Sequence, residues 1–186
     1  EVNQWNLPGV AVYDRSVAWL DPVETQTLVD KTWNETRQIH LAESSEPGSG
    51  FWLVPAELGY WVDPETTAQK AAAVGRAAEP FKDLQGALQG EVQTILPVLY
   101  FDEAAARETL EAIAHSIDIA PQNAKVSFED GSWVASPGLP GRRVNIDANL
   151  EGLFTNAFTN LVSESALLVV EPVQPEIRDL TPVLGE

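Results

Sequence analysis

The sequence predicts an α+β fold of two similar lobes, each with a strand, a helix, a hairpin and a second helix around a small, mainly antiparallel sheet. Three observations predict this class. Short β-rich runs alternate with helical patterns along the chain. The dipeptide Asp130-Gly131 lies between two such runs and is a strong two-residue hairpin signal. Two stretches of the chain also resemble each other at a constant spacing, which is typical of an internal repeat.

The repeat becomes visible when the chain is aligned with itself at an offset of 82 residues (133 − 51). The matching pairs are Phe51 and Trp133, Pro55 and Pro137, Gly59 and Gly141, Val62 and Val144, and Asp63 and Asn145. Upstream, Asp21 matches Asp102 at an offset of 81 (102 − 21), and both suit the N-cap of a helix. We therefore expect a first lobe with a connecting segment over residues 1–93, a second lobe over 94–171, and an exit linker over 172–186 that leads to a downstream domain.

The first half contains four predicted elements. GVAVY is typical of a strand, and the next helix begins after Asp21 with Pro22 at its first position. The runs QIHLA and GFWLV predict a hairpin, and an Ala-rich helix follows, ending near Gly75 or before Pro80. The predicted ranges are 9–13, 21–37, 38–42 with 50–54, and 64–78. Residues 81–93 are expected to join the halves as a weak helix or a helical loop.

The second half repeats this order. TILPVLY predicts a strand over 94–100, in which Pro97 indicates a sheet edge or a bulge. A helix is expected over 102–118, and the runs AKVSFE and SWVAS flank the Asp130-Gly131 turn. The last helix, over 147–163, is expected to bury an amphipathic stripe of Leu150, Leu153, Phe154, Ala157 and Leu161. The closing strand ALLVV leads into PVQPEIRDLTP, whose prolines are typical of an extended exit.

Composition excludes several function classes. The 186 residues carry a formal charge of −17 with a pI near 4.3, which argues against nucleic acid as a partner. The absence of Cys excludes thiol nucleophiles, disulfides and thiolate metal sites. The absence of Met indicates that residue 1 is not a translation start, so we expect an excised segment whose signal peptide or membrane anchor would lie upstream.

One stretch of the second half carries a family resemblance. Its pattern is an "ID" helix end followed by Pro121, then a hairpin, then P-G-x-x-G-R, and then "V-x-I-D" before a helix. The residues that match are Ile117, Asp118, Pro121, Pro137, Gly138, Gly141, Arg142, Val144, Ile146 and Asp147. With GVAV near the start and P-A-E-L-G-x-x-x-D at Pro55–Asp63, the chain resembles the peptidoglycan-binding domain of YoaR-like proteins. The resemblance implies a bacterial module found upstream of VanW-like or L,D-transpeptidase domains.

Catalytic candidates are few. An L,D-transpeptidase needs a Cys nucleophile, which this segment lacks. The only histidines, His40 and His115, fit structural or surface positions better than a triad. Paired carboxylates could hydrolyse glycans, and the candidates are Glu57, Asp63, Glu65, Asp147 and Glu151. Several of these stand where helix starts favour acids, so we expect no enzyme activity.

One stretch of the sequence resembles a metal site. Asn145, Asp147, Asn149 and Glu151 alternate like the oxygen ligands of a calcium loop. The sixth position of that loop is Leu150 rather than Gly, and the twelfth is Asn156 rather than Glu, so the signature fails. Helix capping explains the same residues, and we expect neither a metal nor another cofactor.

Binding residues are expected among the Arg pair and the aromatics. Arg142 and Arg143 form the only adjacent basic pair, and an Arg fork suits the carboxylates of peptidoglycan stem peptides, although ion pairing within the chain is the alternative. Trp52, Tyr60, Trp61 and Trp133 stand at equivalent places in the repeats and could stack on sugars or lie in the core. Strand alternation places Phe51 and Trp52 on opposite faces, and we expect Trp52 to be the exposed one.

Two functions remain open at this point. The first is a non-catalytic, extracytoplasmic cell-wall module that binds peptidoglycan through weak contacts of the loops Pro55–Gly59 and Pro137–Arg143 and positions a neighbouring domain. The second is a structural spacer or protein-interaction domain without affinity for glycans. Burial of Trp52, Trp61 and Trp133 would favour the second.

Overall fold

The computed structural model describes residues 5–43, 48–74 and 91–181. Five α-helices are found there: α1 (Pro22–Asp30), α2 (Pro64–Ala73), α4 (Glu103–Ile117), α5 (Ile146–Thr155) and α6 (Ala157–Ser163). A π-helical turn, η1 (Lys31–Glu35), extends α1, and a 3-10 turn, η2 (Pro55–Leu58), precedes β5. The strands are β1 (Val10–Val12), β2 (Arg15–Ser16), β3 (Ile39–Glu43), β4 (Gly50–Leu53), β5 (Tyr60–Asp63), β6 (Gln93–Ile95), β7 (Val98–Phe101), β8 (Lys125–Glu129), β9 (Ser132–Ser136), β10 (Gly141–Val144), β11 (Ser165–Leu168) and β12 (Val170–Val173). This mixture confirms the predicted α+β class.

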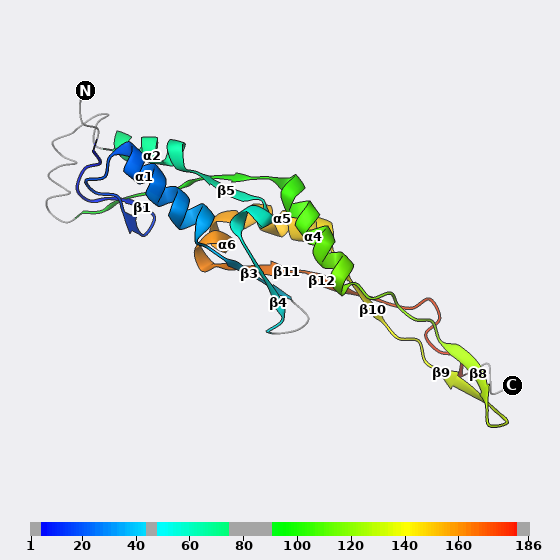
Figure 1. Cartoon of the computed structure of the whole chain (residues 1–186). Helices are drawn as coiled ribbons and strands as arrows, with labels where there is room; N and C mark the ends of the chain where they lie inside the picture. Colours follow the sequence, from blue (N-terminus) through cyan, green and yellow to red (C-terminus); the bar gives the residue numbers. More distant parts are fainter. Residues whose placement is uncertain (1–4, 44–47, 75–90, 182–186) are drawn as a thin grey trace.

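The strands form several small, mainly antiparallel sheets whose orders are β2-β1-β6, β11-β3-β4, β5-β7, β10-β12 and β8-β9. Strands from the two predicted halves pair with each other: β6 lies parallel to β1, β11 lies parallel to β3, and β7 is antiparallel to β5. The molecule is elongated, with β1, α1 and α2 near one end and the β8–β9 hairpin at the other (Figure 1). The halves are therefore joined by backbone hydrogen bonds as well as by the chain.

The halves share several local features. Asp21, Asp63, Asp102 and Asn145 each cap a helix through a side-chain oxygen, as expected. The backbone N–H of Val62 donates to the side chain of Asn34, and the equivalent N–H of Val144 donates to Asp118. In both halves the strand after the hairpin also pairs antiparallel with a later strand, as β5 does with β7 and β10 with β12. These features favour the internal repeat, which stays a prediction, as do the lobe boundaries.

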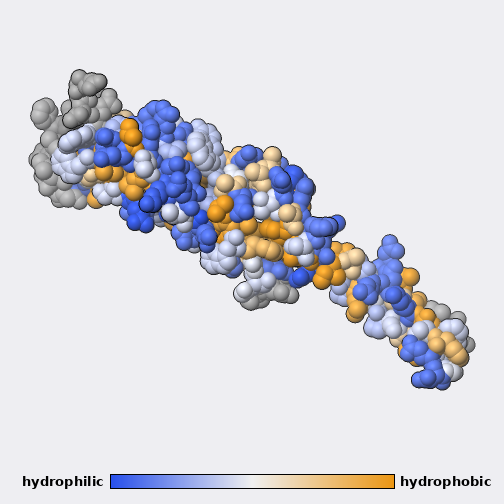
Figure 2. Space-filling view, viewed as in Figure 1, coloured by the Kyte–Doolittle hydropathy of each residue, from blue (hydrophilic) through white to orange (hydrophobic). Residues whose placement is uncertain are grey.

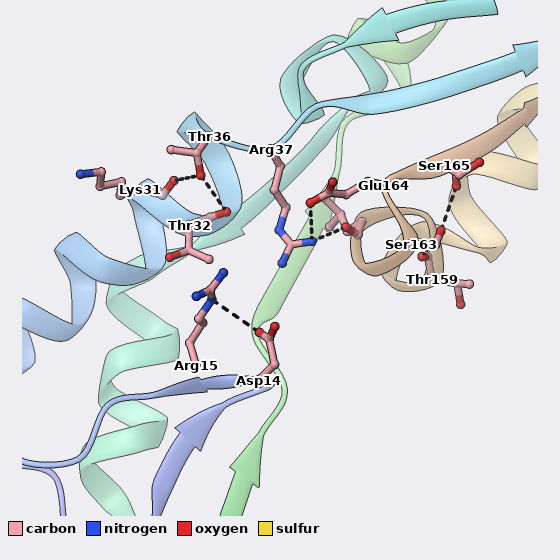
Figure 3. Close-up of polar contacts among 11 residues, drawn as sticks. Asp14, Arg15, Lys31, Thr32, Thr36, Arg37, Thr159, Ser163, Glu164 and Ser165 are labelled. Carbon is pink, nitrogen blue, oxygen red and sulfur yellow. Dashed lines mark hydrogen bonds and ion pairs between the residues drawn. The ribbon is translucent and has the colours of Figure 1, made fainter.

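One hydrophobic core runs through both halves. Its largest fully buried side chains include Trp33, Leu41, Leu110 and Leu161. Arg37 links η1 to α6, because its Nη1 donates to the Leu161 carbonyl at 2.6 Å and lies 3.5 Å from Glu164 Oε1 (Figure 3). Its guanidinium carbon lies 4.1 Å from the centroid of a Trp33 ring, a cation–π contact. Arg37 therefore connects the end of the α1–η1 helix to the end of α6 in the second half of the chain.

The second hairpin stands at the end of a long arm, which we define as residues 119–143 with 174–180. The turn residues Asp130 and Gly131 both have positive φ, +48° and +83°, as the predicted two-residue turn requires. The exit segment runs along this arm: Ala124 N–H donates to the Ile177 carbonyl, and Gly138 N–H donates to the Arg178 carbonyl. Its role as a linker to a further domain stays a prediction.

Several predicted elements need revision or lie outside the described residues. The strand over 94–100 is interrupted at Leu96-Pro97 and becomes β6 and β7, because Pro97 has no N–H to donate. The helix over 147–163 breaks at Asn156, whose backbone and side-chain amides both donate to the Gly152 carbonyl. The expected burial of Phe154 is wrong: it is 65% exposed, because it lies at the margin of the stripe. The connecting segment lies outside the described residues except for 91–93, as does the predicted helix end at 75–78.

The helix α5 offers a stabilising substitution at Gly152. A Cβ added there would meet no heavy atom within 4 Å. Alanine in a helix costs less backbone entropy than glycine, so Gly152→Ala is expected to raise the free energy of unfolding by about 0.5–1 kcal/mol. Urea denaturation of both proteins measures this difference, and equal midpoints would contradict it.

Candidate functional site

Trp61 lies at the mouth of a hollow of about 360 Å³ between α1, β5 and the start of α2. Its indole is 48% exposed and stacks on the ring of Tyr100 from β7, with 6.0 Å between ring centroids and 28° between their planes. The two residues are cross-strand partners in the β5–β7 ladder. A flat aromatic surface therefore borders a concave one.

The rest of this hollow is polar. It is lined by Gln26, Thr27, Asp30, Trp61, Asp63, Pro64 and Glu65. Asp63 caps α2 and accepts hydrogen bonds from the side chain and the backbone of Thr66, which lower the pKa of its carboxyl below the ordinary value of 3.8. Asp63 is thus a carboxylate acceptor at neutral pH. Carboxylates, an amide and a hydroxyl beside an exposed indole form a surface suited to a polyhydroxylated ring.

Trp52 is exposed on β4, away from that hollow. Its side chain is 65% exposed, while Phe51 packs against the core, which confirms the expected alternation. The Trp52 ring lies 4.8 Å from the ring of His40, its cross-strand partner on β3. His40 thus has a packing role, and any ligand contact by Trp52 stays a prediction.

Tyr60 does not reach the surface. Only 1% of it is exposed, and its hydroxyl donates to the Leu153 carbonyl at 2.9 Å and accepts from the Asn160 amide at 2.9 Å. Burial raises the pKa of the Tyr60 phenol to about 12. Tyr60 therefore belongs to the core that links β5 to α5 and α6, and a bound ligand cannot reach it at the surface.

The buried phenol predicts an alkaline loss of stability. Because the folded-state pKa of Tyr60 lies above its ordinary value of 10.0, its stabilisation is complete below pH 10 and is lost as pH rises toward 12. Tyr60→Phe is expected to cost about 1–2 kcal/mol at pH 7, since a partner hydrogen-bonding group stays buried. Denaturation at pH 7 and above pH 10 should show a smaller alkaline decline in the variant. An unchanged decline would contradict this assignment.

The two arginines have different surroundings. Arg142 is half-buried; its Nε donates to the Ile117 carbonyl at 3.0 Å, and its Nη1 contacts Glu43 Oε1 at 3.1 Å. The ion pair, in which Glu43 is buried and Arg142 is partly exposed, connects β10 to β3, and the hydrogen bond to Ile117 connects β10 to the end of α4. Arg143 points outward beside Glu171, its cross-strand partner on β12. Of the pair, Arg143 is the residue that a ligand could reach directly.

Trp133 lies near the tip of the arm, far from Trp61. It is 64% exposed and packs edge-to-face on Phe128, its partner across the hairpin, with 5.1 Å between ring centroids. Other exposed apolar residues follow the arm, namely Ile119, Val134, Leu139 and Ile177. Figure 2 shows hydrophobic patches along this arm, interspersed with hydrophilic ones. Trp133 therefore belongs to a second exposed surface, separate from the Trp61 hollow.

The two predicted binding loops, Pro55–Gly59 and Pro137–Arg143, are held in place by burial and by backbone hydrogen bonds. Pro55 and Leu58 of η2 are buried, and Gly59 approaches the backbone of Asp102 closely. Along Pro137–Arg143, Gly138, Leu139 and Arg142 make backbone hydrogen bonds to the exit segment or to residues 119–122. Both segments therefore hold the fold together, and ligand contacts through them stay a prediction.

Three of the metal and catalytic candidates, Asn145, Asn149 and Glu57, have structural roles. Asn145 caps α5, and the Asn149 amide bonds both the N–H and the carbonyl of Val169. Glu57 accepts from Val54 N–H at the start of η2. Over the described residues we find no group of three or more His, Asp or Glu placed to hold a metal. In the same part of the chain, no helix has the length and apolarity to cross a bilayer.

Comparison with known proteins adds the family. A family described as "Putative peptidoglycan binding domain" matches residues 52–160, more than half of the chain. The chain belongs to this family. Members of the peptidoglycan-binding family are generally non-catalytic, and membership supports a cell-wall-binding role. No curated protein and no solved structure matches the chain.

All six predicted site residues lie inside the range that matches the peptidoglycan-binding family. The structure brings none of Trp52, Trp61 and Trp133 together, because each lies on a different sheet. Sequence reasoning missed Tyr100, the partner of Trp61. Alternation in β7 was the available signal, since adjacent aromatics at Tyr100 and Phe101 must face opposite sides of a strand.

Proposed function

We propose that this chain is a non-catalytic, extracytoplasmic module of a bacterial cell wall that binds the glycan strands of peptidoglycan at the Trp61 hollow. The observation that carries the proposal is the stacked Trp61–Tyr100 pair beside a polar hollow, in a chain of the peptidoglycan-binding family. An exposed indole face can stack on a pyranose ring, and the surrounding carboxylates and amide can accept or donate hydrogen bonds to hydroxyl and acetamido groups.

Local contact must carry this binding because the overall charge opposes it. The chain has a formal charge of −17, and bacterial walls are anionic. Long-range attraction is therefore absent, and stacking with short hydrogen bonds has to supply the affinity. Arg143 adds one exposed positive charge on β10 for a wall carboxylate.

The elongated shape supports a proposed positioning role for a neighbouring domain. The described chain ends along the arm, where residues 174–180 run beside the β8–β9 hairpin (Figure 1). A VanW-like or transpeptidase domain attached through this segment would be held at the end of the molecule that carries the β8–β9 hairpin, opposite to α1 and α2. The wall-binding surface and the attached domain would then be kept apart by a fixed distance.

A protein-interaction role is the second candidate, and the tip of the arm favours it. Phe128 and Trp133 are cross-strand partners exposed together on one face of the hairpin, which is typical of a surface that another protein covers. Burial of Trp52, Trp61 and Trp133 would have favoured a spacer or protein-interaction domain without affinity for glycans. All three are exposed, so this argument for the second candidate does not hold.

Co-sedimentation with purified sacculi tests the proposed function. The chain should pellet with sacculi well above a control protein of similar size and acidity. Binding should persist when salt is raised to about 0.3 M, because screening removes charge attraction and leaves stacking. A pelleted fraction equal to that of the control, or binding that disappears with salt, would contradict the proposal.

A further inference from the structure

A second concave surface lies between α4 and α5. This groove has a volume of about 450 Å³ and is larger than the Trp61 hollow. It is lined by Phe101, Glu103, Arg107, Asp147, Leu150, Glu151 and Phe154. All of these residues lie within the range that matches the family. We call it the α4–α5 groove.

The floor of the groove is apolar and partly uncovered. Phe101 and Phe154 are in contact, with 5.7 Å between ring centroids, and Leu150 is buried beside them. Phe154 nevertheless exposes 65% of its surface. An exposed aromatic ring at the edge of a concave surface is a favourable contact for small apolar groups of a ligand.

The rim carries both signs of charge. Arg107 Nη2 lies 3.1 Å from Glu103 Oε1, and Arg107 Nη1 lies 3.5 Å from Asp147 Oδ1. All three side chains are substantially exposed, so these ion pairs contribute little and can be exchanged for pairs with a ligand. Glu151 adds a third carboxylate, which leaves the groove with two more negative than positive charges.

An apolar floor with three carboxylates and one guanidinium at the rim suits a ligand that carries small apolar groups, an ammonium and a carboxylate. We infer that the α4–α5 groove binds the stem peptide of peptidoglycan, an inference that rests on the proposed function. The free ammonium of its diamino acid would pair with Asp147 and Glu151, a free carboxylate would pair with Arg107, and the alanine methyl groups would lie against Phe154. An acidic peptide without an ammonium would be repelled by the excess of carboxylates.

A synthetic stem tetrapeptide of L-Ala, D-Glu, L-Lys and D-Ala tests the inference by ¹H–¹⁵N chemical-shift titration of the whole chain. We expect saturable shifts centred on α4 and α5, and at least a fivefold weaker Kd when the lysine amine of the peptide is acetylated. Phe154→Ala and Arg107→Gln should each weaken binding at least threefold. Phe128→Ala is the matched control, because Phe128 is similarly exposed but lies on the arm, and it should leave the Kd unchanged.

Several results would overturn the inference. They are an absence of shifts at millimolar peptide, equal binding of the acetylated peptide, shifts centred elsewhere, and shifts that depend on protein concentration alone, which would indicate a second copy in the groove. Sacculi stripped of stem peptides by an amidase separate the two proposals. If the chain pellets with stripped sacculi but does not bind the tetrapeptide, only the α4–α5 inference fails.

Discussion

Gly59→Ala is expected to destabilise the fold by about 3 kcal/mol. Gly59 has φ +75°, and a Cβ there would lie 2.2 Å from the backbone carbonyl oxygen of Asp102. The Gly59 carbonyl also accepts from the Asp102 N–H at 2.7 Å, so neither segment can retreat without losing this hydrogen bond. Thermal unfolding should show a Tm lower by roughly 6–12 °C.

The expected destabilisation by Gly59→Ala has two causes, the positive φ and the contact of the added Cβ with the Asp102 backbone, and Gly131→Ala separates them. Gly131 also has a positive φ, +83°, but a Cβ there would meet nothing within 4 Å. Its cost should be limited to the left-handed backbone, about 1 kcal/mol. If Gly59→Ala destabilised no more than Gly131→Ala, close packing of the η2 turn against the start of α4 would be refuted.

Trp61→Ala is expected to weaken binding to sacculi about tenfold or more, because it removes the aromatic face of the hollow. Tyr100→Ala should weaken binding less, since Tyr100 supports the indole without lining the hollow. A sedimentation isotherm for each protein measures the change, and circular dichroism should show an unchanged fold, since the removed side chains are about half exposed.

Trp52→Ala is the matched control for this substitution. It removes an equally large, exposed indole from β4, where the neighbouring ring is His40 rather than a polar hollow. Binding should be unchanged within about twofold. If Trp52→Ala weakened binding as much as Trp61→Ala, wall binding would depend on exposed tryptophan in general and not on the hollow.

Features of the fold that depend on neighbouring residues could be predicted from the sequence. Each helix cap needs only a side-chain oxygen and N–H groups two or three residues ahead, which is why Asp21, Asp63, Asp102 and Asn145 were identified correctly. The Asp130-Gly131 turn and the exposure of Trp52 follow in the same way from local geometry and strand alternation.

The candidate site depends on contacts between distant residues, and for that reason much of it could not be predicted. The Trp61 hollow joins residues 26–30 to 61–65, and the α4–α5 groove joins residues 101–107 to 147–154. Arg142 contacts Glu43 across 99 positions of sequence, and Tyr60 bonds Leu153 across 93. The residue types of Tyr60 and Arg142 indicated binding chemistry. In the structure Tyr60 is buried in the core, and the Arg142 side chain bonds Ile117 and Glu43 of the same chain.

Indole N–H resonances of the wild-type chain give the most direct test of the glycan site. The chain has six tryptophans, each with one indole N–H signal that a Trp→Phe variant assigns. On addition of soluble disaccharide-repeat fragments of peptidoglycan glycan, the Trp61 signal should shift and saturate, while that of buried Trp33 should stay in place. A Trp61 signal that does not move, while Trp52 or Trp133 shifts, would contradict glycan binding at the Trp61 hollow.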